Sequence, residues 1–452
     1  MSSIPTSPSA GEAAALPTSP ATLDATYRII TWRLIPFLFV LWVLAWVDRV
    51  NVGFVKLTML DELKWTDAIY GFGAGIFFLG YFFFEVPSNL LLQRIGARKT
   101  ITRITLGWGV VCVAMMFTTS PSMFYFLRFL MGVFEAGFYP GIILYLTYWY
   151  PSERRAKAFG MFMSASGVAG VIGGPLAGTI MNGMHGMNGW SGWQWVFLIE
   201  GIPSILAAGA TWWYLTDRPE QARWLTPAQR QMVAADLARD AASLGPREEG
   251  MLASLKQGRL WLLIVIFFCV IAANSSLTFF GPSVVKEAGF TNPATIGWIM
   301  SASYLCGAIG MVVNGLHSDH AAEARLHCAI AAAVGAIGLV LTTVFLPINP
   351  TLALMAQTLA IIGTMSAIPV FWQLPGRFLA GAAAAGGVAL INSIANLAGF
   401  GAPYMLGEIK TRTGGLSLGL LIVAAVEICA TILILWFIPR FSKQAAAVKQ
   451  AA

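Results

Sequence analysis

Residues 34–60 read LIPFLFVLWVLAWVDRVNVGFVKLTML, and this stretch decides how the chain must fold. The residues from Leu34 to Val47 are apolar or proline, the charged pair Asp48-Arg49 follows, and the apolar pattern resumes through Val55. A helix needs about 20 mostly apolar residues to cross a bilayer, so the spanning segment must include the charged pair. Each ionised side chain inside a span costs on the order of 2.5–3.5 kcal/mol and usually marks an ion or substrate path. The stretch therefore predicts a spanning helix that carries a transport site.

The composition of the whole chain is typical of a polytopic helical membrane protein. Of its 452 residues, 57% are hydrophobic and only 11% are charged, whereas soluble domains contain roughly 25% charged residues. The five cysteines lie in or beside apolar runs without C-x-x-C spacing, so neither a disulfide nor a metal site is expected. The net charge of +7 comes from basic residues between apolar runs, where topology explains it, and no nucleic-acid partner is expected.

The apolar runs number twelve and form two sets of six. The expected spans cover about 30–56, 67–92, 101–119, 122–148, 156–182 and 193–215, and then about 259–285, 294–317, 326–347, 350–373, 383–409 and 415–439. The predicted fold class is an all-α membrane protein with 12 transmembrane helices in two six-helix repeats. The predicted divisions are a disordered cytosolic N-terminal tail (1–27), an N-terminal bundle (28–215), a cytosolic linker (216–258), a C-terminal bundle (259–440) and a cytosolic C-terminal tail (441–452).

Basic residues predict the orientation of these spans. They gather on alternate connections: Arg94, Arg98, Lys99 and Arg103, then Arg154, Arg155 and Lys157, then the linker, Arg325, Arg377, and Arg440 with Lys443. The connections on the other side carry few basic residues, and Asp61, Glu62 and Asp67 offset Lys56 and Lys64. The positive-inside rule therefore places both termini in the cytosol. Within the linker, Thr226-Pro227 is expected to cap and start a short helix with an apolar face formed by Met232, Val233 and Leu237.

Two similar loops and five short motifs carry a family resemblance. Residues 89–99 and 315–325 both approximate a G-x-x-x-D-R-x-G-R-K loop, and the motifs lie at 48–54, 80–89, 128–136, 148–154 and 193–203. Together they resemble the anion:cation symporter family of the major facilitator superfamily, which includes bacterial tartrate, sugar-acid and hydroxyphenylacetate permeases. The resemblance covers roughly 28–440 and implies the major facilitator fold. One departure is that Asn89 and Gln93 replace the usual Gly and Asp of the first loop, whereas the second loop keeps Gly315 and Asp319.

Four charged residues of the first half are the main site candidates. Arg128 and Glu135 are seven apart, so they share a helix face about 10 Å apart along the axis. Asp48 and Arg49 point about 100° apart, so one can meet a substrate anion or Glu135 while the other faces a neighbouring helix. The resemblance implies that Asp48 and Glu135 couple to protons and that Arg49 and Arg128 bind the substrate carboxylate. The alternative is that these charges only hold helices together.

Further candidates come from the second span and from the second half. Tyr81 is expected to donate to substrate, and Glu85, Arg98 and Asp319 are assigned to gating, with aromatic packing and helix-end roles as the alternatives. In the second half, Trp372, Gln373, Asn392 and Asn396 are candidate substrate contacts, although polar side chains also join helices in membranes. Glu200 and Glu427 are expected to be structural.

These observations predict a proton-coupled symporter that takes up a small organic carboxylate by alternating access between two similar halves. An organic-anion or drug antiporter of the same fold is the alternative. An enzyme is not expected, because no nucleophile–base set or metal cluster has catalytic spacing, and a channel would show rings of like charge. No cofactor is expected. The resemblance implies a monomer in the bacterial inner membrane, with the substrate open between a hydroxy-diacid, a sugar acid and an aromatic acid.

Overall fold

The computed structural model describes residues 20–244, 258–321, 323–375 and 382–451, and within these ranges every regular element is helical. The first half contains α1 (Pro20–Leu63), α2 (Asp67–Ile95), α3 (Ala97–Ala114), η1 (Met115–Phe117), α4 (Pro121–Glu135), α5 (Phe138–Thr147), α6 (Ser152–Met163), α7 (Ala165–Met184), η2 (Met187–Gly189) and α8 (Gly192–Tyr214). The connection contains η3 (Pro219–Gln221) and α9 (Pro227–Leu244). The second half contains α11 (Gly258–Glu287), α12 (Pro293–His320), α13 (Ala324–Phe345), α14 (Pro350–Phe371), α16 (Ala382–Ala395), α17 (Ala398–Thr413) and α18 (Ser417–Ala451).

The predicted twelve-helix fold is confirmed. Eleven segments of the described chain are long and apolar enough to span a membrane, with α4–α5 and α6–α7 each counted as one. The pair α16–α17 supplies the twelfth span, because it occupies the predicted run 383–409 and is interrupted between Ala395 and Ala398. Two short helices replace one long helix at that place, so neither alone reaches spanning length.

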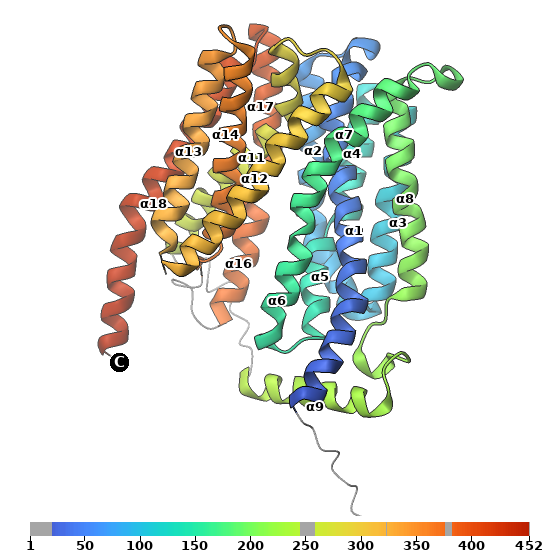
Figure 1. The fold of residues 1–452 in the computed structure, drawn as a ribbon, viewed down its shortest axis with the longest axis vertical. Coiled ribbons are helices and arrows are strands. Elements are labelled where there is room, and N and C mark those ends of the chain that lie inside the picture. Colours follow the sequence, from blue (N-terminus) through green and yellow to red (C-terminus); the bar gives the residue numbers. More distant parts are fainter. Residues whose placement is uncertain (1–19, 245–257, 322, 376–381, 452) are drawn as a thin grey trace, which may run out of the picture.

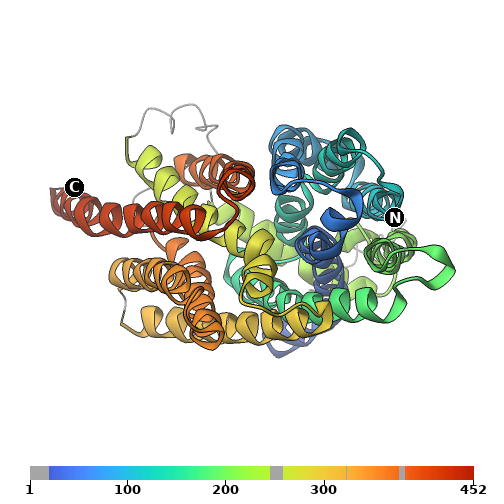
Figure 2. The same ribbon diagram turned by 90° about the horizontal axis from the view of Figure 1, so that it is seen from above.

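The helices form two bundles that stand side by side, with α9 lying across one end of the first bundle (Figures 1 and 2). The bundles meet mainly through α2 against α17 and α7 against α12. At both seams glycine lets the backbones approach closely: a Cβ on Gly71 would lie 2.4 Å from the Pro403 carbonyl oxygen, and one on Gly174 would lie 2.6 Å from that of Gly297. These contacts lie toward the end opposite α9, so the two bundles are closed together there.

The first and last helices extend beyond their predicted bounds, whereas the linker helix lies where it was predicted. Helix α1 already begins at Pro20, inside the predicted tail, because Thr26 and Tyr27 are buried and the Tyr27 hydroxyl donates to Asp236 of α9 at 2.8 Å. Helix α18 continues to Ala451, past the predicted end of the last span. The predicted linker helix is confirmed: Gln229 N–H donates to Thr226 Oγ1 at 3.2 Å, and Val233 is fully buried. Arg377, the rest of the tail (1–19) and linker residues 245–257 lie outside the described residues.

The glycine seam between α7 and α12 gives a stability prediction. Gly174→Ala is expected to lower the melting temperature of the purified protein by several degrees, because its Cβ would meet the Gly297 backbone rather than a movable side chain. Gly183→Ala on the same helix is the matched control, since a Cβ there meets nothing within 4 Å. Thermal unfolding in detergent measures both. Equal melting temperatures for the two variants would contradict the packing argument.

Candidate functional site

An ion pair between Arg49 of α1 and Glu135 of α4 lies at the centre of the first bundle. Arg49 Nε donates to Glu135 Oε1 at 2.9 Å, and Nη2 contacts the same oxygen. The side chains are 13% and 3% exposed, respectively. Each residue lies about 21 Å along its helix from the end opposite α9, which is deep within a hydrocarbon core of about 30 Å. The pair is therefore a charged site inside the membrane.

A break in the fourth span gives Glu135 its position. Helix α4 ends at Glu135, Ala136 leaves the helical conformation, and Gly137 has a φ of +81° before α5 begins. The span predicted over 122–148 is confirmed as one membrane-crossing segment, Pro121–Thr147, and the break lies within it. A helix C-terminus carries partial negative charge, which a carboxylate would reinforce, so the Arg49 guanidinium stabilises both the side chain and the helix end. Gly137 also has no room for a Cβ, which would lie 2.5 Å from the Ser88 Cβ.

Asp48 faces the opposite way, into the first bundle. Its Oδ2 accepts from Ser204 Oγ of α8 at 2.5 Å, and its Oδ1 lies 3.4 Å from the Cys112 thiol of α3. Its 2% exposure leaves it no contact with the space between the bundles. Glu200 is buried nearby, and neither of its carboxyl oxygens has a hydrogen-bond partner among the described residues. Asp48 and Glu200 thus form a second buried acidic cluster, separate from the Arg49–Glu135 pair.

Arg128 is brought close to the pair but bonds elsewhere. Its guanidinium donates to the carbonyl oxygens of Gly73 and Ala74 on α2, each at 3.3 Å, and its Nη1 lies 3.4 Å from the Met131 sulfur. The guanidinium carbons of Arg49 and Arg128 lie 5.1 and 5.0 Å from the centroid of the same Phe77 ring. Arg128 therefore joins α4 to α2 in this conformation, and its charge lies beside the site without contacting Glu135.

Tyr81 and Glu85 of α2 extend the site toward the second bundle. The Arg49 guanidinium lies 5.5 Å from the centroid of the buried Tyr81 ring. Glu85, one turn further along, accepts from Ser393 Oγ of α16 at 2.8 Å, and the Asn392 side chain interacts with the same carboxyl group. Glu85 thus connects the two bundles between the ion pair and the α9 end, a position that suits the predicted gating role. Of the second-half candidates, Asn392 comes nearest to the first-half charges.

The other second-half candidates lie apart from the ion pair. Trp372 follows the last turn of α14 and packs edge-on against Phe267 at a centroid distance of 4.8 Å. Gln373 Nε2 donates to Asp319 Oδ1 at 2.8 Å, so it connects α14 to the end of α12. Asn396 Nδ2 donates to the Asn392 carbonyl oxygen at 2.9 Å, which satisfies the helix end where α16 stops. The Trp372 and Gln373 contacts join neighbouring helices of the second half, whereas the Asn396 contact is local to the end of α16.

The remaining predicted residues lie at helix ends or in the second core. Arg98 begins α3 beside the linker, where its backbone N–H donates to Asp217 Oδ1 at 2.7 Å. Glu427 is fully buried on α18, and its Oε1 accepts from Thr364 Oγ1 of α14 at 2.8 Å. The missing side chain of Gly335 leaves room for this carboxyl group, since a Cβ there would lie 2.5 Å from Oε1. Glu427 therefore links three helices of the second half.

An ionic network that the sequence did not predict joins the bundles at the end opposite α9. Lys56 Nζ lies 2.6 Å from Asp67 Oδ1, and Lys410 of α17 lies 3.7 Å from the same oxygen and 3.1 Å from Glu287 Oε1 of α11. Lys286 adds an exposed pair with Asp61 at 3.0 Å. These residues were interpreted only as topology charges. The sequence shows only that both halves carry acids and bases on the sparsely basic side, and it does not say which of them pair.

Comparisons with known proteins agree with this architecture. The family model of the Major Facilitator Superfamily matches residues 37–403. A solved D-xylose–proton symporter has a TM-score of 0.72 at 14% identity, covering 91% of this chain and 98% of its own. At that identity the likeness concerns the fold.

Two curated relatives are much more similar in sequence. A protein of Agrobacterium vitis, provisionally named a tartrate transporter, is 40% identical over 412 residues and covers 90% of each chain. A quinolone resistance transporter of Acinetobacter baumannii is 39% identical over 407 residues, covering 90% of this chain and 93% of its own. Both relatives are named as transporters.

The ionic network gives a prediction with a matched control. Asp67→Asn leaves Lys56, which is 4% exposed, without its nearest carboxylate. Removing one partner of a buried ion pair lowers the free energy of unfolding by about 3–5 kcal/mol. A smaller loss is expected here, because the Asp67 side chain is one-fifth exposed. Asp61→Asn removes the exposed pair with Lys286, for which about 0–1 kcal/mol is expected. Thermal unfolding of both variants should therefore show the larger loss for Asp67→Asn, and the reverse order would refute the role of Lys56.

Proposed function

Because the chain belongs to the major facilitator superfamily and is a membrane transporter, we propose that it takes up a small organic carboxylate together with protons. The observation that carries the proposal is the Arg49–Glu135 pair, a guanidinium already bound to a carboxylate inside the membrane. A guanidinium binds carboxylates through a planar fork of donors and stays charged when poorly solvated. A substrate carboxylate can therefore take the place that Glu135 now occupies.

Proton binding to Glu135 makes this exchange favourable in the proposed mechanism. While Glu135 is ionised, it competes with the substrate for Arg49 and repels the incoming anion. Once protonated, Glu135 no longer neutralises Arg49, and a lone buried cation favours an anionic partner. Protons then raise substrate affinity, and substrate raises proton affinity by the same factor. Asp48 is proposed as a second proton carrier, acting within the acidic cluster with Glu200 rather than at the substrate.

Alternating access in this proposal uses the contacts between the two bundles. The glycine seams and the ionic network close the end opposite α9, while Glu85 and Ser393 join the bundles on the α9 side of the pair. With α9 and both termini in the cytosol, as the basic loops predict, this is a state closed toward the outside of the cell. Rocking of the halves would break the ionic network and open that side. The membrane is proposed to be the bacterial inner membrane.

The substrate is proposed to be a hydroxylated carboxylate, in keeping with the tartrate assignment given to one relative. Its carboxylate would bind Arg49, with Arg128 adding positive charge beside it. Its hydroxyl end would meet Tyr81 and Asn392, the candidates that lie nearest the pair toward the second half. Export of a drug or organic anion remains the second candidate, because another relative of similar identity is named a quinolone resistance transporter.

Proton coupling is tested by replacing the carboxyl group of the pair. Glu135→Gln is expected to abolish accumulation of L-tartrate driven by an acid-outside pH gradient in proteoliposomes, while exchange of labelled for unlabelled tartrate continues. Glu427→Gln is the matched control, because that carboxyl is equally buried but contacts α14 in the other half. Unchanged accumulation by Glu135→Gln would move coupling to Asp48. Faster efflux into an acidic outside medium by the unaltered protein would favour the exporter.

Substrate binding is tested at Arg49 itself. L-tartrate, gluconate and 4-hydroxyphenylacetate are screened for the rise in melting temperature that each gives the purified protein. Arg49→Gln is expected to abolish the rise given by the best ligand, because the guanidinium is its proposed partner. Arg128→Gln is expected to lower the melting temperature without ligand, since Arg128 bonds to α2. A full ligand response in Arg49→Gln would remove Arg49 from the binding site.

A further inference from the structure

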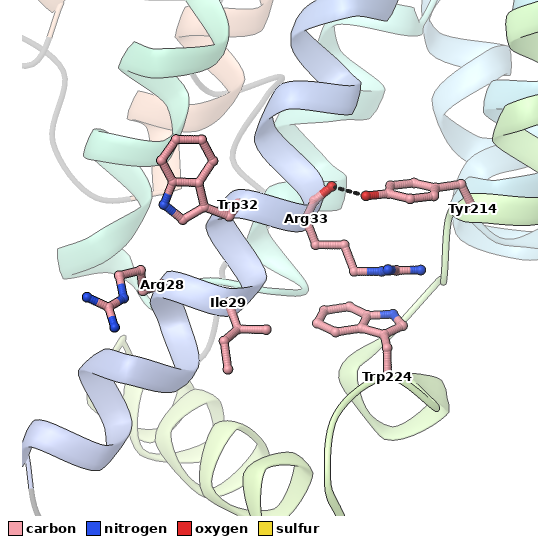
Figure 3. A pocket seen from close by; sticks show the side chains of 6 residues that line it. All are labelled: Arg28, Ile29, Trp32, Arg33, Tyr214 and Trp224. Carbon is pink, nitrogen blue, oxygen red and sulfur yellow. Dashed lines mark hydrogen bonds between the residues drawn. The ribbon is translucent and has the colours of Figure 1, made fainter.

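A basic pocket at the α9 end of the first bundle is independent of the transport site. It consists of two adjoining cavities of about 480 and 650 Å³ that share Arg33, Tyr214 and Trp224. The first is also lined by Arg28, Ile29 and Trp32 of α1 (Figure 3), and the second by Arg98 and Arg223. Arg33 lies about 24 Å along α1 from Arg49, so the pocket belongs to the surface of the membrane rather than its interior.

The Arg33 side chain lies between two aromatic rings and has no anionic partner among the described residues. Its guanidinium carbon lies 4.4 Å from the centroid of the Tyr214 ring and 4.9 Å from that of the Trp224 ring, and Figure 3 shows it between them. The Tyr214 hydroxyl donates to the Arg33 carbonyl oxygen at 3.0 Å, which fixes α8 against α1. Arg33 Nε is buried and has no hydrogen-bond partner in the described chain. The two aromatic rings thus orient the Arg33 guanidinium, whose Nε donor is free to bind a ligand.

The charge of the pocket is strongly positive. Arg28, Arg33, Arg98 and Arg223 line it, and their side chains make no ion pair within the described ranges. Asp217 is the one carboxylate among the lining residues, and its Oδ1 already accepts from the Arg98 backbone N–H. Arg98 Nε, like Arg33 Nε, is buried without a partner among the described residues. The pocket therefore has several positive charges and unused donors for one anion.

The surroundings of the pocket are those of a membrane interface. Trp32 on α1 and Trp213 on α8 are 75% and 85% exposed beside it, and Ile29 is 44% exposed. Tryptophan side chains with this exposure are typical of the depth of lipid headgroups. Basic pockets between spanning helices at this depth bind the phosphate groups of acidic lipids. A free phosphate would satisfy the arginines but would make no use of the exposed apolar side chains around them.

We propose that this pocket binds the phosphate headgroup of an acidic phospholipid, with Arg33 and Arg223 on the phosphate and the acyl chains along α1 and α8. The bound lipid would connect α1, the end of α8 and the linker segment before α9. It would thereby stabilise the first bundle where the linker leaves it. This inference does not depend on the transported substrate.

The test compares lipids on the purified full-length protein. Phosphatidylglycerol added to the detergent-solubilised protein is expected to raise its melting temperature by several degrees more than phosphatidylcholine does. The double variant Arg33→Gln/Arg223→Gln should lose this difference. The single variant Arg223→Gln, which changes an exposed side chain, should lose most of it. Arg94→Gln is the matched control: it removes one exposed charge from the same end of the bundle, outside the pocket.

Three results would overturn the proposal. Equal gains from phosphatidylglycerol in the unaltered protein and in the double variant would show that the pocket is not the site. An equal loss in Arg94→Gln would mean that general surface charge, not the pocket, attracts the lipid. If inorganic phosphate at the same concentration gave the same gain, and the double variant lost it, the ligand would be a soluble anion instead. Native mass spectrometry of retained phosphatidylglycerol gives a second readout.

Discussion

The Arg49–Glu135 pair is the interaction on which the rest of the first half depends. Neither charge is tolerable alone at this depth, because an unpaired buried ion costs several kcal/mol. The break after Glu135 sets the carboxylate at a helix end, where only a nearby cation offsets its repulsion from the helix dipole. Glycines between α2 and α4 then bring Arg128 close enough to bond the α2 backbone. Burying these charges therefore costs free energy, and the close packing of α2 against α4 keeps them in position.

The buried charged residues are distributed unequally between the two halves. The described second half holds one deeply buried acid, Glu427, and it is bonded to Thr364 inside its own bundle. Its contacts with the first half include the glycine seams, aromatic packing such as Phe72 against Phe400, an ionic network at one end, and the Ser393–Glu85 hydrogen bond. The ion pairs and hydrogen bonds among these contacts can be exchanged for others, which suits a surface that must open and close. In the proposed mechanism, the charged first half binds the substrate anion and the second half moves against it.

The fold could be predicted from the sequence because twelve long apolar runs leave few alternatives in a bilayer. The opposed directions of Asp48 and Arg49 also followed from helix geometry alone. The break after Glu135 could not be predicted from Ala136-Gly137, since glycine is also frequent inside helices that cross membranes. Arg128 was grouped with Glu135 by its spacing, yet its donors met the α2 carbonyls, a partner that only tertiary packing reveals. Lys56, Asp67 and Lys410 looked like loop charges because pairing across halves leaves no local signal.

In the proposed mechanism, the same ion pair would set the direction of coupling through the charge of the substrate. An anionic substrate needs Arg49, so it binds better after Glu135 is protonated, and proton and substrate must travel together. A cationic substrate would need the Glu135 carboxylate, so it would compete with the proton, and the two must travel in opposite directions. One architecture therefore serves a symporter or an exporter without any change in its folded state. Under this mechanism, relatives of nearly equal identity could carry names as different as tartrate transport and quinolone resistance without a change of fold. A symporter and an exporter of this fold would therefore differ in whether protons raise or lower substrate affinity. No contact in the fold separates them.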